Sequence, residues 1–290
     1  MVAELRSAIP DSVVGEFTDV DLMLAQANAR GIGHLVLSPW IRLACDMCEL
    51  QNQALSSLAA ARPGRVSALG AVPLQDPPAA AECLAALMTL PGMRGAEIPA
   101  SVAGRYLGDG VFEPFWEAAE STGALIFVHP TTTGFGLDAL RDGYLWNSVG
   151  NPMETAVTAA HMITAGVLER HPGLKILLAH GGGGLPALRG RLRRAFAVRP
   201  EARSRAAEEP DASLRRFYYD SLTHDREVLA ALVGLVGPEH VMLGSDRPFD
   251  MGSDDPVGDI RALGLGPDEE LLLGGNAARV LGIDATQGQR

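Results

Sequence analysis

The sequence predicts an α/β fold, a (β/α)8 TIM barrel in which the first strand is missing or substituted. The chain has 290 residues, 47% of them hydrophobic, enough for the core of a one-domain barrel. Short apolar runs alternate with segments of helical periodicity, which indicates a parallel sheet with both faces covered. Seven such runs, one fewer than a closed barrel needs, lie at 34–38, 66–72, 95–98, 124–129, 175–180, 217–221 and 241–246.

The remaining segments fit one domain over residues 1–290, with residues 1–17 as an irregular start. The first helix is expected at 19–30, because Asp19 suits a helix N-terminus. Two other helices are expected at 111–122 and 154–169. The stretches 131–153 and 196–214 are too long for plain connections and are interpreted as insertions that roof the active site or form an oligomer contact.

Charge and cysteine content narrow the class of protein. The formal net charge of -11 repels phosphate backbones and anionic membranes, so we expect neither nucleic acid nor a membrane as a partner. Three cysteines give no even disulfide framework, which suits a reducing compartment. We find no secretory segment and no apolar run near the roughly 20 residues that span a bilayer, and we expect a cytoplasmic protein.

Three polar side chains close strands of the predicted sheet. His129 ends FVHP, His180 ends LLAH, and Asp246 ends GSD. The carboxyl ends of barrel strands meet at one mouth, where barrel enzymes have their active sites. Imidazole and carboxylate are ligands that bind zinc or a similar divalent ion. A lone histidine is as often a buried hydrogen-bonded residue, but the joint placement favours a catalytic site.

The segment after His180 adds a weaker signal. Glycines 181–184 allow close backbone approach and are expected to leave amide groups facing a ligand. Four arginines follow on the next predicted helix, where a guanidinium could grip a carboxylate, although most of them are expected on a solvated face. His224 and Asp225 follow another strand end. They could reach the rim of the pocket, or they could cap the N-terminus of the next helix.

With these residues in place, the chain resembles the amidohydrolase-related family that includes aminocarboxymuconate-semialdehyde decarboxylase and related metal-dependent carboxy-lyases. The resemblance covers about residues 17–283. It rests on ordered motifs, including RPGRVSALGAVPLQDP, ALIFVHP, KILLAHGGGGLPALRGR, FYYDSLTHD, HVMLGSDRPFDMG and GGNAARVLGI. The resemblance implies a metal-dependent hydrolase type of barrel.

The resemblance also implies roles for the candidate residues. His129 and Asp246 fall on metal-ligand positions, and His180 falls on the position of a catalytic acid/base. One divalent ion per site, with zinc (Zn2+) expected, is typical of the family. Arg191 falls where decarboxylases present an arginine to the substrate carboxylate across a homodimer interface. Trp146 and Asn151 fall in the loop that lines the substrate pocket.

One departure from the family pattern concerns the start of the chain. Family members open with a strand that carries a His-x-His or Glu-x-His pair of ligands, whereas the first histidine here is His34. We expect that the chain starts after this strand; the alternative is that residues 3–17 supply a substitute strand without ligands. With two ligands absent, metal binding and activity are expected to weaken.

The leading functional prediction is a metal-dependent carboxy-lyase (decarboxylase) acting on a small unsaturated or aromatic carboxylate. A metal-dependent hydrolase of a lactone, ester or amide uses the same constellation and is the first alternative. An N-terminally truncated or metal-free inactive barrel is the second.

Overall fold

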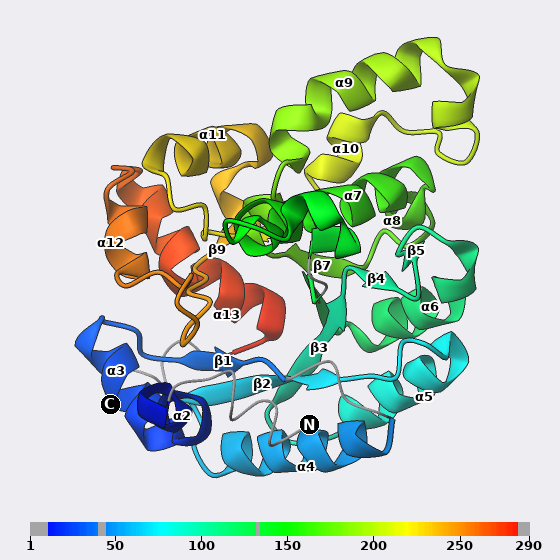
Figure 1. The fold of residues 1–290 in the computed structure, drawn as a ribbon. Coiled ribbons are helices and arrows are strands. Elements are labelled where there is room, and N and C mark those ends of the chain that lie inside the picture. The colour runs from blue at the N-terminus through cyan, green and yellow to red at the C-terminus, as the bar shows by residue number, and fades with distance from the viewer. Residues whose placement is uncertain (1–10, 40–44, 132–133, 284–290) are drawn as a thin grey trace.

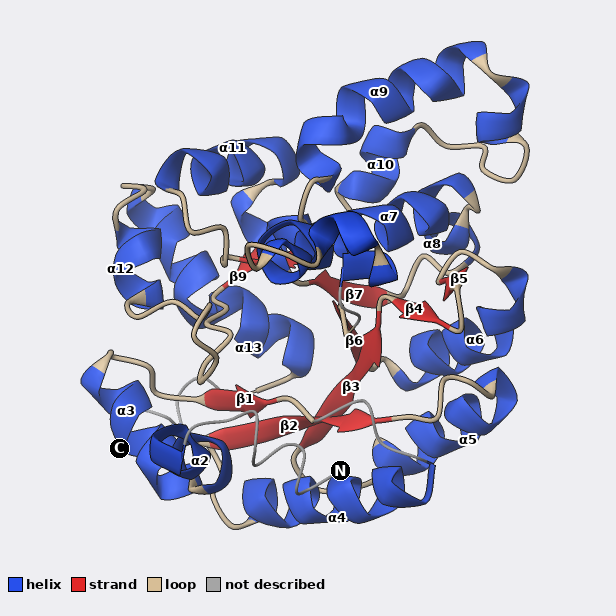
Figure 2. Ribbon diagram, in the orientation of Figure 1, coloured by secondary structure: helices blue, strands red, loops and turns tan. Residues whose placement is uncertain are grey.

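The protein is an α/β structure built around a seven-stranded parallel sheet (Figures 1 and 2). A computed structural model describes residues 11–39, 45–131 and 134–283. The sheet curls as part of a barrel, in the order β1-β2-β3-β6-β7-β8-β9, and every neighbouring pair is parallel. The strands are β1 (Leu35–Leu37), β2 (Val66–Ala71), β3 (Met93–Pro99), β6 (Leu125–His129), β7 (Lys175–Leu178), β8 (Tyr218–Asp220) and β9 (Val241–Met242).

Each of the seven predicted strands is confirmed. Uninterrupted apolar runs are typical of parallel strands that are covered on both faces. In β2 all six residues are buried. A short antiparallel hairpin of β4 (Ser101–Val102) and β5 (Arg105–Tyr106) was not predicted, since two-residue strands have no readable periodicity.

Helices lie around the outside of the sheet (Figure 2). Their starts and stops follow local chemistry: Asp19 accepts from the N–H groups of Asp21 and Leu22 at the start of α3, and Gly166, at φ 68°, separates α7 from α8. The α-helices are α2 (Asp11–Thr18), α3 (Val20–Ala29), α4 (Cys45–Ala60), α5 (Pro77–Leu87), α6 (Glu113–Thr122), α7 (Asn151–Thr164), α8 (Val167–Arg170), α9 (Leu185–Val198), α10 (Pro210–Leu214), α11 (Arg226–Val236), α12 (Pro256–Arg261) and α13 (Asn276–Leu281).

The expected irregular start is wrong for residues 11–17. They belong to helix α2, so this part of the alternative substitute strand at 3–17 is also wrong. The segment DSVVGEFT contains no alanine, the strongest helix former, but it begins with aspartate, a residue favoured at helix starts. Residues 1–10 lie outside the described residues.

The two predicted insertions contain short helical turns and parts of longer helices. The first, 131–153, holds η2 (Gly134–Gly136), η3 (Asp138–Leu140) and η4 (Trp146–Gly150), then enters α7. The second, 196–214, holds the end of α9, η6 (Pro200–Arg203) and α10. In Figure 1, α9 reaches the upper corner of the molecule, away from the strands.

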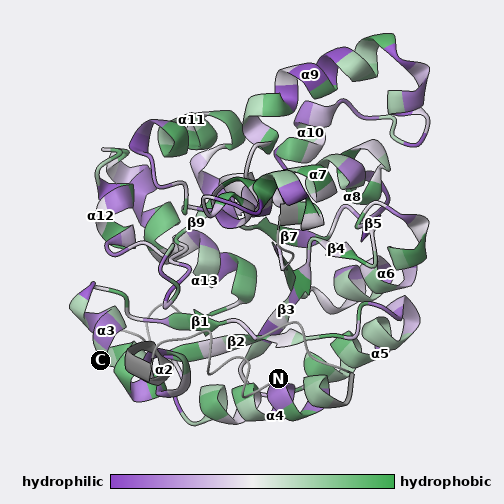
Figure 3. Cartoon of the chain, in the orientation of Figure 1, coloured by the Kyte–Doolittle hydropathy of each residue, from purple (hydrophilic) through white to green (hydrophobic). Residues whose placement is uncertain are grey.

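The main core lies between the sheet and the outer helices. Phe112, Phe115, Trp116, Phe217 and Tyr219 are its largest fully buried side chains. Figure 3 shows that α11 is hydrophobic over most of its length, whereas hydrophilic and hydrophobic residues alternate along α9. No helix in the described parts of the chain combines the length and apolar character that a membrane crossing needs.

Candidate active site

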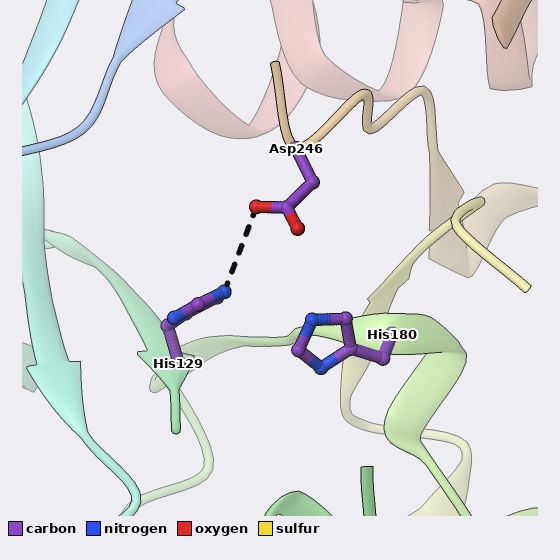
Figure 4. A group of neighbouring side chains, drawn as sticks. All are labelled: His129, His180 and Asp246. Atoms are coloured by element: carbon purple, nitrogen blue, oxygen red, sulfur yellow. Dashed lines mark ion pairs between the residues drawn. The ribbon is translucent and has the colours of Figure 1, made fainter. Parts of the chain in front are cut away.

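His129, His180 and Asp246 meet at the carboxyl end of the sheet (Figure 4). His129 ends β6, His180 follows β7 after one residue, and Asp246 follows β9. One potential ligand atom from each residue lies within 4.8 Å of the other two. His129 Nε2 is 3.8 Å from Asp246 Oδ1, and the two imidazole ring centres are 5.1 Å apart. The sequence prediction that these three side chains share one small volume is confirmed.

The surroundings shift the protonation of all three groups. Burial lowers the pKa of His129 to about 4. Burial, helped by repulsion from His129 and His224, lowers the pKa of His180 to about 3. Burial, helped by the negative charges of Asp220 and Asp250, raises the pKa of Asp246 to about 7. Both imidazoles are therefore neutral near pH 7, with lone pairs available.

Asp220, at the end of β8, fixes the turn that carries His180. The backbone N–H groups of His180 and Gly181 donate to its two carboxylate oxygens at 2.9 and 2.7 Å, and Leu222 N–H donates at 3.1 Å. His180 takes φ 57° and Asp246 φ 51°, a left-handed conformation that is uncommon for residues other than glycine. Such conformations persist where the surroundings impose them, often at active sites.

The glycine run gives the close approach that the sequence predicts, but its first three amides bond to groups of the protein itself. A Cβ on Gly183 would lie 1.8 Å from the carbonyl oxygen of Pro152, and a Cβ on Gly182 would lie 2.7 Å from the ring of Tyr219. The Gly181 amide is bonded to Asp220, while the Gly182 and Gly183 amides bond to carbonyl groups within the turn. For these three amides the prediction that they face a ligand is wrong, because a buried carboxylate and the turn itself use the donors.

Glu97 on β3 is a fourth polar group at this site, and sequence reasoning missed it. It is 7% exposed, and its Oε1 lies 3.9 Å from His129 Nδ1, on the opposite side of the ring from Asp246. Burial, together with the charge of Asp246, raises the pKa of Glu97 to about 8 although Ser38 hydrogen-bonds to it. The sequence did contain a signal for Glu97, which is the acid within the otherwise apolar run GAEIP. Burying a carboxylate costs free energy unless it has a partner, so an acid in a buried strand indicates a polar site.

A cavity of about 520 Å³ opens beside the cluster, and His180 and Asp246 form part of its lining. His224 also lines the cavity, and Asp225 caps α11 by accepting hydrogen bonds from the N–H groups of Glu227 and Val228. The pair therefore has both predicted roles, one residue at the pocket and the other at the helix start. The further lining residues are Asn147, Ser148, Pro152, Gly181, Gly183, Pro186, Ala187, Arg189, Leu222, Thr223, Val228, Ala231, Leu232, Leu235 and Met251.

The predicted substrate-binding residues lie near this cavity without lining it. Trp146 packs edge-on against Tyr144, with ring centres 5.1 Å apart, and its neighbours Asn147 and Ser148 face the cavity instead. Asn151 is buried at the start of α7. Arg191 is exposed on α9 and does not line the cavity within this chain.

Arg189, two residues earlier on α9, is the arginine that lines the cavity. It is half-buried, and among the described residues its guanidinium has no hydrogen-bond or ion-pair partner. Two residues along a helix differ by about 200° around its axis, which explains why Arg189 faces the cavity and Arg191 does not. An unpaired guanidinium on a cavity wall is suited to binding an anion.

The donor set fits a divalent cation. Two neutral imidazoles and one carboxylate are ligands of the kind that zinc and similar ions take. His180 Nδ1 is buried and bonds to no described residue, so one polar atom of this residue still needs a partner. Positive charge there would also offset the burial, and the repulsion from Asp220 and Asp250, that raise the pKa of Asp246.

A curled parallel sheet with histidine and aspartate at its strand ends defines a barrel-type enzyme. Comparison with known proteins agrees: the model of the amidohydrolase family matches residues 7–283, and the chain belongs to this family. The resemblance seen in the sequence is thereby confirmed, as is the predicted fold class.

Similar proteins are decarboxylases. The chain is 34% identical over 278 residues to 2-amino-3-carboxymuconate-6-semialdehyde decarboxylase of Dictyostelium discoideum, covering 92% of this chain and 77% of that protein. It is 30% identical over 248 residues to gamma-resorcylate decarboxylase of Rhodococcus jostii, covering 80% and 74%. The crystal structure of 5-carboxyvanillate decarboxylase from Sphingomonas paucimobilis superposes with a TM-score of 0.86 at 27% identity, covering 94% and 86%.

Proposed function

We propose that this protein is a metal-dependent decarboxylase of a small aromatic or unsaturated carboxylate. The observation that carries the proposal is the cluster of His129, His180 and Asp246, within 4.8 Å, beside a cavity, in a chain related to decarboxylases. In this proposal His129 and Asp246 hold one divalent ion, for which we propose Zn2+. The ion would supply Lewis-acid chemistry, withdrawing electrons from a substrate oxygen.

His180 would hold and deliver the proton. Decarboxylation breaks the bond between a ring carbon and the carboxylate carbon, carbon dioxide leaves, and a proton replaces it on the ring carbon. The neutral imidazole of His180 lines the cavity and can accept a proton before it passes one on. Its backbone bonds to Asp220 keep the ring in place throughout.

The remaining predicted residues contribute to substrate binding in this proposal. Arg189 would bind the carboxylate from within the chain, and Arg191, exposed on the same helix, would reach the site of a second copy in a homodimer. Trp146 and Asn151 would hold the segment Asn147–Ser148 against the cavity. We further propose a cytoplasmic location.

Metal analysis and product analysis test the proposal together. We expect His180→Ala to keep the metal content of the wild type and to lose carbon dioxide release from hydroxybenzoic acids by at least a hundredfold. Asp246→Asn should lose the metal. His161→Ala, at a histidine outside the cluster, is the control and should keep both.

Two results would contradict specific parts of the proposal. Loss of metal in His180→Ala would make His180 a ligand. Turnover of lactones or esters without carbon dioxide release would identify a hydrolase, the alternative that uses the same donor set.

A further inference from the structure

Glu97 is a buried acid that no cation of the described chain neutralises. It is 7% exposed and lies in β3 opposite Phe127 of β6, two residues before His129 in that strand. Among the residues that the structure describes, no arginine or lysine forms an ion pair with it, and its polar neighbours are Ser38 and the ring of His129. A carboxylate buried without a cation costs stability, so the packing of the fold does not explain this residue.

Glu97 and Asp246 lie at the two ring nitrogens of His129. Glu97 Oε1 is 3.9 Å from Nδ1, and Asp246 Oδ1 is 3.8 Å from Nε2. A neutral imidazole carries a proton on one nitrogen and a lone pair on the other. An ion held between His129 and Asp246 needs the lone pair of Nε2, so the ring proton then belongs on Nδ1, the side of Glu97. A carboxylate on that side stabilises this tautomer.

The charge of the cluster indicates the same role. Both imidazoles are neutral near pH 7, so Asp246 brings one negative charge to an ion that carries two positive charges. Asp220 is another acid nearby, but three backbone N–H groups already bond to its carboxylate. The backbone of Pro130 also hydrogen-bonds to the His129 ring, but it carries no charge. Glu97 is the buried acid that remains to balance the ion.

We propose that Glu97 is a positioning residue of the metal centre, which holds His129 with the Nε2 lone pair directed at the ion and supplies the second negative charge. The separation of 3.9 Å exceeds a hydrogen bond, and a shift of about 1 Å completes one. Glu97 acts through His129 and not as a ligand, since it is not among the three residues whose ligand atoms lie within 4.8 Å of one another. This inference rests on the proposed function and adds a residue to its metal centre.

Zinc affinity and the stability of the metal-free chain together test this inference. Glu97→Gln keeps the size of the side chain and removes its charge. We expect the dissociation constant for Zn2+, measured by competition with a chelator, to rise about 10- to 100-fold, as for other carboxylates that orient a metal-binding histidine. The melting temperature of the metal-free variant should equal or exceed that of the metal-free wild type, because a buried acid without a cation has been removed. A residue that only supports the fold would give lower stability with unchanged zinc affinity.

Glu154→Gln is the matched control. Glu154 is also a buried acid, 1% exposed, and accepts a hydrogen bond from Ser101 Oγ at 2.7 Å, outside the metal cluster. This variant should keep the zinc affinity of the wild type. Glu97→Asp keeps the charge on a shorter side chain and should recover part of the affinity that Glu97→Gln loses. With Co2+ as the probe, Glu97→Gln should keep the visible absorption spectrum of the wild type, because the ligands themselves are unchanged.

The outcomes separate this inference from the proposed function. Weaker zinc binding in Glu97→Gln, with stability intact, supports the role of Glu97 even if no acid is decarboxylated, in which case only the proposed function fails. Equal zinc affinity in Glu97→Gln and the wild type overturns the inference and leaves the proposed function standing. A changed Co2+ spectrum would make Glu97 a ligand and would overturn the positioning role. A wild-type chain that binds no Zn2+ would overturn both proposals.

Discussion

Gly183→Ala is expected to be among the most destabilising single-methyl changes in this protein. Gly183 has φ 59° and ψ -131°, a region that residues with a Cβ rarely enter, at a cost of about 1–3 kcal/mol. The added methyl would lie 1.8 Å from the carbonyl oxygen of Pro152, whereas carbon and oxygen in contact are about 3.3 Å apart. The turn and the start of α7 must separate by about 1.5 Å, and overpacking of this kind adds about 1–3 kcal/mol.

We therefore expect a total loss of about 2–6 kcal/mol in the free energy of unfolding. Urea denaturation followed by circular dichroism measures it. Gly190→Ala is the matched control, because Gly190 lies inside α9 with nothing within 4 Å of an added Cβ; it should stabilise the protein by about 0.5–1 kcal/mol. A loss below about 1 kcal/mol in Gly183→Ala would show that the turn relaxes independently of α7, and the reasoning would be refuted.

Two further predictions concern carboxylates. Asp220→Asn places an NH2 group against at least one backbone N–H that now donates to the carboxylate. We expect the free energy of unfolding, measured by urea denaturation, to fall by about 1–3 kcal/mol, and carbon dioxide release to fall because His180 is displaced. Wild-type values for both quantities would contradict this prediction. Hydrogen bonds from Arg170, and then from His171, lower the pKa of Glu113 to about 2. The ionised Glu113 therefore contributes its full stabilisation of the folded state above pH 4.5, and this contribution is lost as the pH falls towards 2. Between pH 5 and pH 3, Glu113→Gln should therefore lose about 1 kcal/mol less stability than the wild type, and parallel pH curves would refute this.

The strands were predictable because their physical signal is local. A strand covered on both faces is apolar at most positions, so a run such as ALIFV can be recognised without reference to the rest of the chain. The hairpin at Ser101–Val102 and Arg105–Tyr106 has two residues per strand and no such signal. Its existence depends on tertiary contacts, including the bond from Ser101 to Glu154 on α7.

The cluster was predictable for a different reason, since parallel strands impose a common edge. His129, His180 and Asp246 needed only to follow three strands to be brought together. Glu97 obeys the same rule, and it was missed only because the acid was taken as part of its strand. The partner of the glycine amides was not predictable, because Asp220 lies 39 residues beyond Gly181 and reaches it only through the β7–β8 pairing.

Much of the cavity wall comes from helices. The sequence shows the periodicity of a helix, but it does not show which face of the helix turns towards the cavity. Arg189 and Arg191 carry the same charge and lie two residues apart on the same helix, so the sequence does not distinguish them. The orientation of α9 places Arg189 at the cavity and leaves Arg191 exposed. The face of α11 that lines the cavity has the same origin. The helical spacing could be read from REVLAALVGLV, but only the packed structure shows that Val228 and Ala231 line the cavity while Leu229 and Val233 are buried in the core. In this protein the groups proposed for the chemistry therefore follow from the sheet, and the surfaces that line the cavity follow from how α9 and α11 pack on it.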